Sequence, residues 1–140
     1  IEERFFFGRL NRRSFFLSEY LNGVDADVFF ATEHDKEKRS EMVKSIVELF
    51  YRMYLLDISH GDMKANNIKI VGKQPTLIDL DSMKQHRFRL IAKHRHARDL
   101  RRFMRNWQQT DNVDERLLSA FKKVFKVVYI DHAPLKLAGI

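Results

Sequence analysis

The stretch SHGDMKANNIKIVGKQPTLIDLDSM, residues 59–83, decides how the chain is interpreted. Its two short apolar runs, NIKIV and PTLIDL, are separated by GKQ, a pattern that predicts a β-hairpin. Asp62 and Lys64 precede this hairpin, Asn67 begins its first strand and Asp79 closes its second. Because antiparallel strands bring their outer ends together, we expect Asn67 and Asp79 to lie side by side.

These side chains are the parts that phosphoryl transfer needs. Asn67 and Asp79 offer oxygen ligands, and Mg²⁺ prefers few protein oxygens together with substrate phosphates. Asp62 would accept a proton from an attacking hydroxyl, and Lys64 would neutralise charge on the moving phosphoryl group. The alternatives are structural: Asp62 caps a loop, Lys64 is solvated, Asn67 forms an Asx turn and Asp79 merely ends a strand.

The remainder of the chain predicts an α+β fold with more helix than strand. Apolar residues recur at helical spacing in three segments, at about residues 35–57, 90–107 and 113–128. The aromatic runs Arg4–Phe7 and Ser14–Tyr20 predict a second hairpin around a polar turn at Gly8–Arg13. The segment VDADVFF, residues 24–30, fits either a short strand or the start of a helix.

Composition limits the class of protein. The chain has 140 residues, enough for one domain, and its twelve Phe residues favour a substantial core. It has no cysteine, which excludes disulfides and thiolate metal sites. The net charge is +7, and Lys84–Arg105 holds nine Lys or Arg residues and one acid. Such a stretch is either a solvated helix face or a surface for polyanions: nucleic acid, phosphorylated glycolipid or an anionic membrane.

Two motifs carry a family resemblance. HGDMKANN, residues 60–67, resembles the catalytic loop of the protein-kinase-like superfamily, and LIDLD, residues 77–81, resembles its metal-binding motif. The sequence pattern HGDMKANNIKI…PTLIDLDSM…ARDLRRFMR is most similar to that of the lipopolysaccharide core heptose and Kdo kinases of Gram-negative bacteria. The resemblance implies that Asp62 is the catalytic base and that Lys64 contacts the transferred phosphate. It implies that Asn67 and Asp79 hold magnesium.

The resemblance covers roughly residues 15–105 and implies further roles. FLSEYLNG, residues 16–23, resembles the hinge between two kinase lobes, where backbone groups of Glu19 and Leu21 would bond the adenine of ATP. His60 would brace the catalytic loop. Asp99 would match a helix aspartate that receives backbone N–H bonds from that loop.

The chain also departs from the protein-kinase pattern. Asp81 stands where the metal-binding motif has glycine, and is either a second metal ligand or a polar turn residue. The short distance from Asp79 to Asp99 leaves no long activation segment, which disfavours a protein substrate. The glycine-rich phosphate loop and the strand lysine belong before the hinge, so the resemblance implies an N-terminal lobe that is largely missing from these residues.

The resemblance therefore implies a protein-kinase-like C-terminal lobe, mostly helical with β-hairpins. Residues 1–23 would form the end of the N-terminal lobe and the hinge, and residues 24–140 the C-terminal lobe. These 140 residues alone are expected to have little or no activity, because the parts that position ATP are absent from them.

The expected function is an ATP-dependent, Mg²⁺-dependent kinase that phosphorylates a heptose or Kdo hydroxyl of the lipopolysaccharide inner core. We expect it in the cytoplasm, with peripheral contact to the inner membrane through Lys84–Arg105 and no specific nucleic-acid partner. One alternative is a small-molecule or antibiotic kinase of the same fold, although a +7 chain suits cationic drugs poorly. Another is a non-catalytic basic fragment that binds nucleic acid or membrane.

Overall fold

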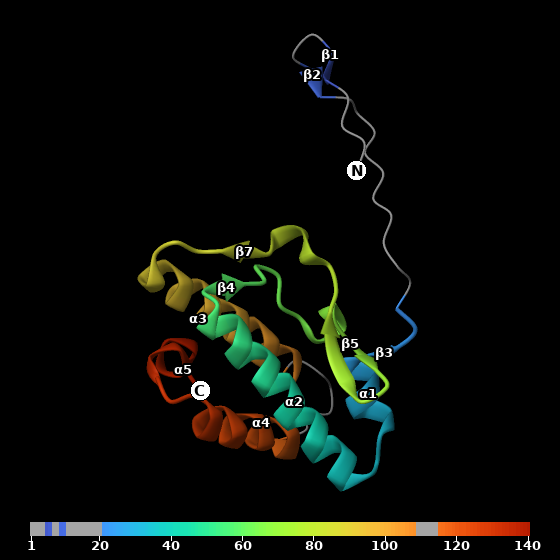
Figure 1. Cartoon of the computed structure of the whole chain (residues 1–140). Coiled ribbons are helices and arrows are strands. Elements are labelled where there is room, and N and C mark those ends of the chain that lie inside the picture. Colours follow the sequence, from blue (N-terminus) through green and yellow to red (C-terminus); the bar gives the residue numbers. More distant parts are fainter. Residues whose placement is uncertain (1–4, 7–8, 11–20, 109–114) are drawn as a thin grey trace.

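The structure is a computed structural model that describes residues 5–6, 9–10, 21–108 and 115–140 (Figure 1). Helices and small antiparallel sheets share one core, so the α+β prediction is confirmed. The elements in chain order are β1 (Phe5–Phe6), β2 (Arg9–Leu10), β3 (Val24–Asp25), α1 (Ala26–Thr32), α2 (Lys36–Leu55), β4 (Ile58–Ser59), η1 (Ala65–Asn67), β5 (Ile68–Val71), β6 (Gln74–Leu77), η2 (Leu80–Ser82), β7 (Lys84–Gln85), α3 (Arg89–Asn106), α4 (Glu115–Val128) and α5 (Ala133–Ala138).

Helix α2 follows the pattern predicted for residues 35–57. Its N-cap is Asp35, whose carboxylate accepts hydrogen bonds from the backbone of Glu37 at 2.8 Å and Lys38 at 3.3 Å. The exposed, charged residues gather near its start. Its apolar face is buried, and the residues on it are Met42, Val43, Ile46, Val47, Phe50, Met53 and Tyr54.

Aromatic rings from α2, α3 and α4 form the centre of the core. Phe103 of α3 lies 5.0 Å from Phe50 and 5.1 Å from Phe121, measured between ring centroids. Trp107 stacks on Phe121 at 5.8 Å, and both are buried. Edge-to-face and offset ring contacts of this kind add to the stability gained from burial alone. In the described part of the chain, each helix is too short or too polar to cross a membrane.

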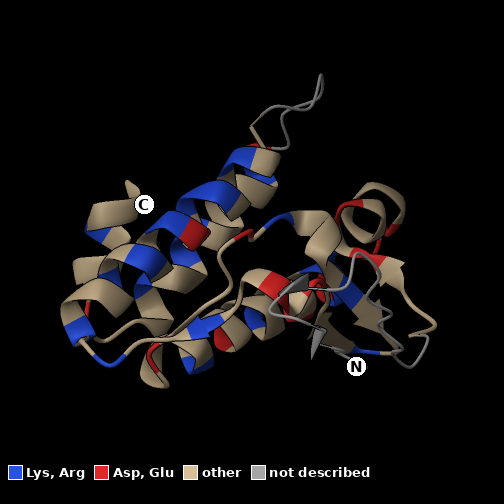
Figure 2. Cartoon of the chain, turned by 90° about the horizontal axis from the view of Figure 1, so that it is seen from above, with Lys and Arg blue, Asp and Glu red and all other residues tan. Residues whose placement is uncertain are grey.

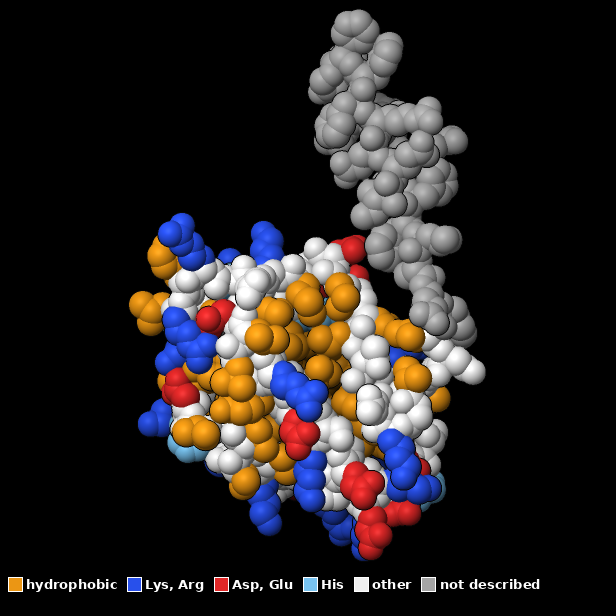
Figure 3. Space-filling model, in the orientation of Figure 1, with side chains coloured by type: hydrophobic (Ala, Val, Ile, Leu, Met, Phe, Trp, Pro, Cys, Tyr) orange, Lys and Arg blue, Asp and Glu red, His pale blue; other side chains and the backbone are white. Residues whose placement is uncertain are grey.

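Helix α3 has two different sides. Its inner side supplies core residues such as Leu100 and Phe103, while Lys and Arg line its outer side (Figure 2). The helix matches the segment predicted at residues 90–107. Figure 3 shows that hydrophobic side chains also reach the surface, between charged ones, on the face of Figure 1.

The predicted hairpin of residues 67–80 is present. Strands β5 and β6 pair antiparallel, with Ile68 opposite Leu77 and Val71 opposite Gln74, and β3 pairs with the other edge of β5. The segment VDADVFF contains both of its predicted alternatives, because β3 ends at Asp25 and α1 begins at Ala26. The register places the start of β5 beside the end of β6, where the candidate site lies.

Some predicted boundaries were wrong. In the N-terminal hairpin, β1 pairs with Arg9–Leu10, which lies inside the predicted turn Gly8–Arg13. The predicted strand Ser14–Tyr20 and the start of the helix predicted from residue 113 lie outside the described residues. The two-residue strands β4 and β7 and the short helix α5 were missed, since none is long enough to show a hydrophobic period.

A buried polar contact ties α3 to the C-terminal segment. The Nε2 atom of His96 lies 2.8 Å from the hydroxyl of Tyr129, and the His96 ring packs 5.3 Å from that of Tyr54. Burial lowers the pKa of His96 from 6.5 to about 3, and the nearby charge of Arg89 acts in the same direction. The folded protein therefore holds a neutral imidazole at this position.

Mild acid should weaken the fold through His96. Because the folded state binds this proton less tightly than the unfolded chain, its stabilising contribution is present above pH 6.5 and is lost as the pH falls below it. The free energy of unfolding should fall by about 1.4 kcal/mol per pH unit from this group. Urea denaturation of wild type and His96→Gln should show a flatter pH dependence in the variant. The exposed neighbour His94→Gln is the control, and an equal slope in wild type and His96→Gln would contradict the assignment.

Candidate active site

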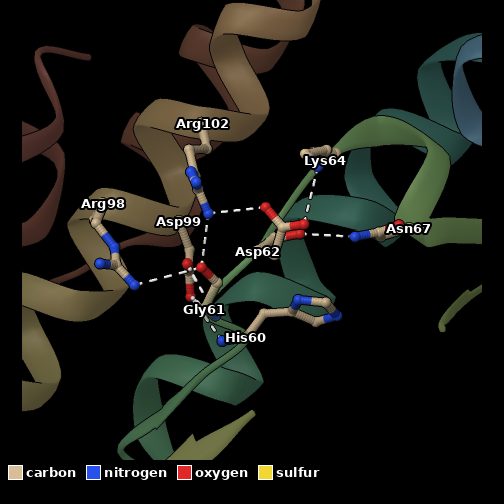
Figure 4. Close-up of polar contacts among 8 residues, drawn as sticks. All are labelled: His60, Gly61, Asp62, Lys64, Asn67, Arg98, Asp99 and Arg102. Carbon is tan, nitrogen blue, oxygen red and sulfur yellow. Dashed lines mark hydrogen bonds and ion pairs between the residues drawn. The ribbon is translucent and has the colours of Figure 1, made fainter. Parts of the chain in front are cut away.

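The loop that follows β4 is anchored by Asp99 of α3 (Figure 4). The Asp99 carboxylate is fully buried and accepts hydrogen bonds from the backbone N–H of His60 at 2.7 Å and of Gly61 at 3.1 Å. Burial raises the pKa of Asp99, while the two backbone hydrogen bonds oppose that rise. The anchoring contact predicted for Asp99 is confirmed.

Gly61 is the residue at which the loop meets two other segments. Its backbone φ of +89° is one that residues other than glycine rarely adopt. A Cβ atom there would lie 2.7 Å from the carbonyl oxygen of Ser82. Its own carbonyl accepts hydrogen bonds from Arg102 at 2.7 Å and Arg98 at 3.3 Å. Glycine is thus required here by the backbone geometry and by the close approach of residue 82.

His60 links this loop to the end of the hairpin. Its side chain is fully buried, and its Nε2 atom lies 3.1 Å from the carbonyl oxygen of Ile78. Ile78 directly precedes Asp79 in the chain. The ring therefore holds the segment that leads into Asp79 against the loop that carries Asp62, which is the bracing role expected for it.

Asp62 is held by two cations. Its Oδ2 atom lies 2.9 Å from Lys64 Nζ, and its Oδ1 atom lies 2.8 Å from a guanidinium nitrogen of Arg102 (Figure 4). The hydrogen bond from Lys64, aided by the charges of Lys64 and Arg102, holds the pKa of Asp62 below 3.8. Asp62 is therefore an ionised carboxylate near neutral pH, with 30% of its side chain exposed.

Asn67 connects the loop to the hairpin. Its side chain is largely buried, and Nδ2 donates to the backbone carbonyl of Asp62 at 2.7 Å. Its own backbone carbonyl accepts from Ile78 N–H at 3.0 Å. Through these two bonds, residue 67 touches residue 62 and lies opposite the residue that precedes Asp79. The backbone arrangement expected for Asp62, Asn67 and Asp79 is present.

Asp79 differs from the prediction in its local structure. Strand β6 ends at Leu77, so Asp79 does not close a strand but precedes the 3₁₀ turn η2. Its backbone is left-handed, with φ of 57° and ψ of 60°, and its side chain is exposed. A left-handed Asp is uncommon, and such strained residues cluster at functional sites. Asp81 lies inside η2 and is exposed as well.

Two residues were predicted to bond adenine, Glu19 and Leu21. Glu19 lies outside the described residues. Leu21 is half-buried in the coil that leads to β3. The sequence interpretation missed Arg98 and Arg102, although their i, i+4 spacing on α3, on either side of Asp99, would have placed both on the face that meets the loop.

The residues present suit magnesium better than a metal that needs a larger protein cage. Within residues 21–108 and 115–140, no three His, Cys, Asp or Glu side chains gather into a metal site. Mg²⁺ is commonly held by one or two carboxylates with substrate phosphates and water. Asn67 can add a carboxamide oxygen to such a site, because its Nδ2 donates to the backbone carbonyl of Asp62 while its Oδ1 has no donor among the described residues.

Comparisons with known proteins agree with this geometry. No curated protein matches the chain. The family model for the lipopolysaccharide kinase (Kdo/WaaP) family matches residues 7–125, a span that includes the HGDMKANN motif, the β5–β6 hairpin and helix α3. Because this match covers well over half of the sequence, the chain belongs to the lipopolysaccharide kinase (Kdo/WaaP) family.

Proposed function

We propose that the protein is an ATP-dependent phosphotransferase that phosphorylates a sugar hydroxyl of the lipopolysaccharide inner core, on heptose or Kdo. Membership of a lipopolysaccharide kinase family supports a kinase with this class of acceptor. The observation that carries the proposal is the position of Asn67, bonded on one side to Asp62 and on the other to Ile78 beside Asp79. These contacts bring the backbones of the proposed base and of the two proposed oxygen ligands into one small region, which supports the proposal.

In the proposed mechanism, Asp62 accepts the proton of the sugar hydroxyl as the hydroxyl oxygen attacks the γ-phosphorus of ATP. A P–O bond forms to the sugar, the bond to the β-phosphate oxygen breaks, and ADP leaves. Lys64 would offset charge on the transferred group, and Arg102 would hold the Asp62 carboxylate in place. Mg²⁺, bound by Asn67 and Asp79, would supply charge neutralisation at the phosphates.

The domain assignment belongs to the same proposal. Residues 1–23 would form the end of the N-terminal lobe and the hinge, where backbone groups of Glu19 and Leu21 would bond adenine. Residues 24–140 would be the protein-kinase-like C-terminal lobe. The mostly helical architecture with a hairpin beside the candidate loop supports this assignment. We place the protein in the cytoplasm, in peripheral contact with the inner membrane where its glycolipid acceptor lies.

The test uses the protein with a complete N-terminal lobe, because residues 1–140 alone are expected to have little or no activity. Transfer of labelled phosphate from ATP to isolated core oligosaccharide is measured, with Mg²⁺-dependent nucleotide binding in parallel. We expect chelation of Mg²⁺ to abolish both, because the phosphate charge is then unopposed. Asp79→Asn should require more Mg²⁺ for half-maximal binding, since it removes one charged ligand. Asp27→Asn, an exposed change on α1, is the matched control.

The results distinguish the proposal from its rivals. If nucleotide affinity changes neither on removal of Mg²⁺ nor in Asp79→Asn, the metal assignment is refuted. Transfer to an aminoglycoside, with none to core sugar, would favour the small-molecule kinase instead.

A further inference from the structure

The corner between β7 and the start of α3 exposes large apolar side chains. Phe88 is 64% exposed, Leu90 74% and Ile91 48%. They fall within four consecutive residues, whereas isolated exposed apolar residues are ordinary. Figure 3 shows hydrophobic side chains projecting beside Lys and Arg at the upper left edge, where Figure 1 places this corner.

The charge around this corner has one sign. Residues 82–98 contain no Asp or Glu. Lys84, Arg87 and Arg95 are exposed and have no carboxylate partner among the described residues. The guanidinium of Arg87 lies 6.0 Å from the centre of the Phe88 ring, so cation and aromatic ring point into the same region.

Three other cations of the basic stretch Lys84–Arg105 form ion pairs within the chain. Arg89 pairs with Asp57 at 2.6 Å, Lys93 with Asp131 at 2.7 Å, and Arg102 with Asp62 at 2.8 Å. Unpaired positive charge therefore accompanies the apolar side chains at the start of α3. The sequence interpretation expected contact through the whole basic stretch. The exposed large apolar residues of that stretch, Phe88, Leu90 and Ile91, lie only at this corner.

We propose that this corner binds an anionic membrane surface. We call it the docking corner, and its residues are Lys84, Arg87, Phe88, Leu90, Ile91 and Arg95. Cationic groups would meet lipid phosphates while Phe88, Leu90 and Ile91 enter the boundary between headgroups and acyl chains. Leu90 and Ile91 have no π-face on which a nucleobase could stack, so the composition favours lipid over single-stranded nucleic acid.

The choice of a membrane as partner rests on the proposed function, since a core glycolipid is anchored in one. The same helix that begins at the docking corner carries Asp99 and Arg102, which hold the candidate loop. Docking the start of α3 would therefore set the orientation of Asp62 relative to the membrane. This places the docking corner in a positioning role, outside the chemistry itself.

The test is flotation of the protein with vesicles of equal parts phosphatidylethanolamine and phosphatidylglycerol, compared with vesicles of phosphatidylethanolamine and phosphatidylcholine. We expect binding to the anionic vesicles that weakens with salt. Phe88→Ser/Leu90→Ser should weaken it by about tenfold or more, because two apolar side chains that would enter the membrane are lost. Each of Arg87→Gln and Arg95→Gln should weaken it by about fivefold.

The matched control is Val127→Ser/Ile130→Ser, which removes apolar residues 77% and 86% exposed, one in the last turn of α4 and one just after it. Equal loss in the control and in Phe88→Ser/Leu90→Ser would overturn the proposal, as would absence of binding to anionic vesicles. Tighter binding to single-stranded RNA than to these vesicles, abolished by the same substitutions, would also overturn it.

Vesicle binding and catalysis are measured separately, so the two proposals fail separately. Asp62→Asn should float with anionic vesicles as wild type does, because Asp62 lies outside the docking corner. Phe88→Ser/Leu90→Ser should keep Mg²⁺-dependent nucleotide binding, and should lose transfer to vesicle-embedded glycolipid while retaining transfer to soluble core oligosaccharide. Loss of transfer to both acceptors would count against a positioning role.

Discussion

Replacing Asp62 with asparagine should lower the rate of phosphate transfer by about 10²–10⁴-fold, the usual contribution of a positioned general base. Asparagine keeps the size of the side chain but cannot take the hydroxyl proton. It also gives up the ion pairs with Lys64 and Arg102, which lie 2.9 Å and 2.8 Å from the carboxylate. The KM for ATP should change far less than kcat, because the nucleotide would be held by other groups.

The pH dependence gives a second readout for Asp62. Lys64 first, and then Arg102, hold the pKa of Asp62 below 3.8, so the carboxylate is ionised throughout the neutral range. Wild-type kcat should therefore show no loss from this group until the pH falls below about 4. Asp27→Asn should leave the rate unchanged. Turnover of Asp62→Asn at the wild-type rate would remove Asp62 from the role of base.

The long elements of this fold were predictable because the apolar residues of each recur with a regular spacing that is visible in a single sequence. Helix α2 buries residues such as Ile46, Val47 and Phe50 along one face, and their spacing alone marks the helix. Strands of only two residues, such as β4 and β7, are too short to show a hydrophobic period. β4 and β7 pair next to a backbone hydrogen bond of 2.9 Å from His86 to Asp57, so they depend on contacts between residues far apart in the chain.

The candidate site was predictable in its residue types but not in its supports. The spacing of Asp62, Asn67 and Asp79 around a hairpin indicated that their backbones meet, and the hydrogen bond between Ile78 and Asn67 agrees. The left-handed backbone of Asp79 and the contact of Arg102 with Asp62 depend on tertiary packing. Sequence spacing gives candidate partners on a helix face, but packing decides which carboxylate an arginine reaches.

Asp99→Ala should lower the free energy of unfolding by about 2–5 kcal/mol. The substitution removes the acceptor of the buried N–H of His60 and of the partly buried N–H of Gly61, now bonded to Asp99 at 2.7 Å and 3.1 Å. Each unsatisfied buried donor costs about 1–3 kcal/mol. Because the same bonds hold the loop that carries Asp62, phosphate transfer should fall with stability. Urea denaturation and the transfer assay measure the two effects.

Asp99→Asn separates the hydrogen bonds from the charge. Its amide oxygen can still accept from both N–H groups, because Asp99 Oδ2 already lies 2.7 Å from His60 N and 3.2 Å from Gly61 N. We therefore expect a smaller loss of stability than for Asp99→Ala. Burial raises the pKa of Asp99 above 3.8, so its contribution to stability is greatest below pH 3.8 and is lost as the pH rises through the folded-state pKa. Asn, which has no proton to release, should lack this dependence, and equal stabilities of Asp99→Ala and Asp99→Asn at neutral pH would show that Asp99 does not anchor the loop through these bonds.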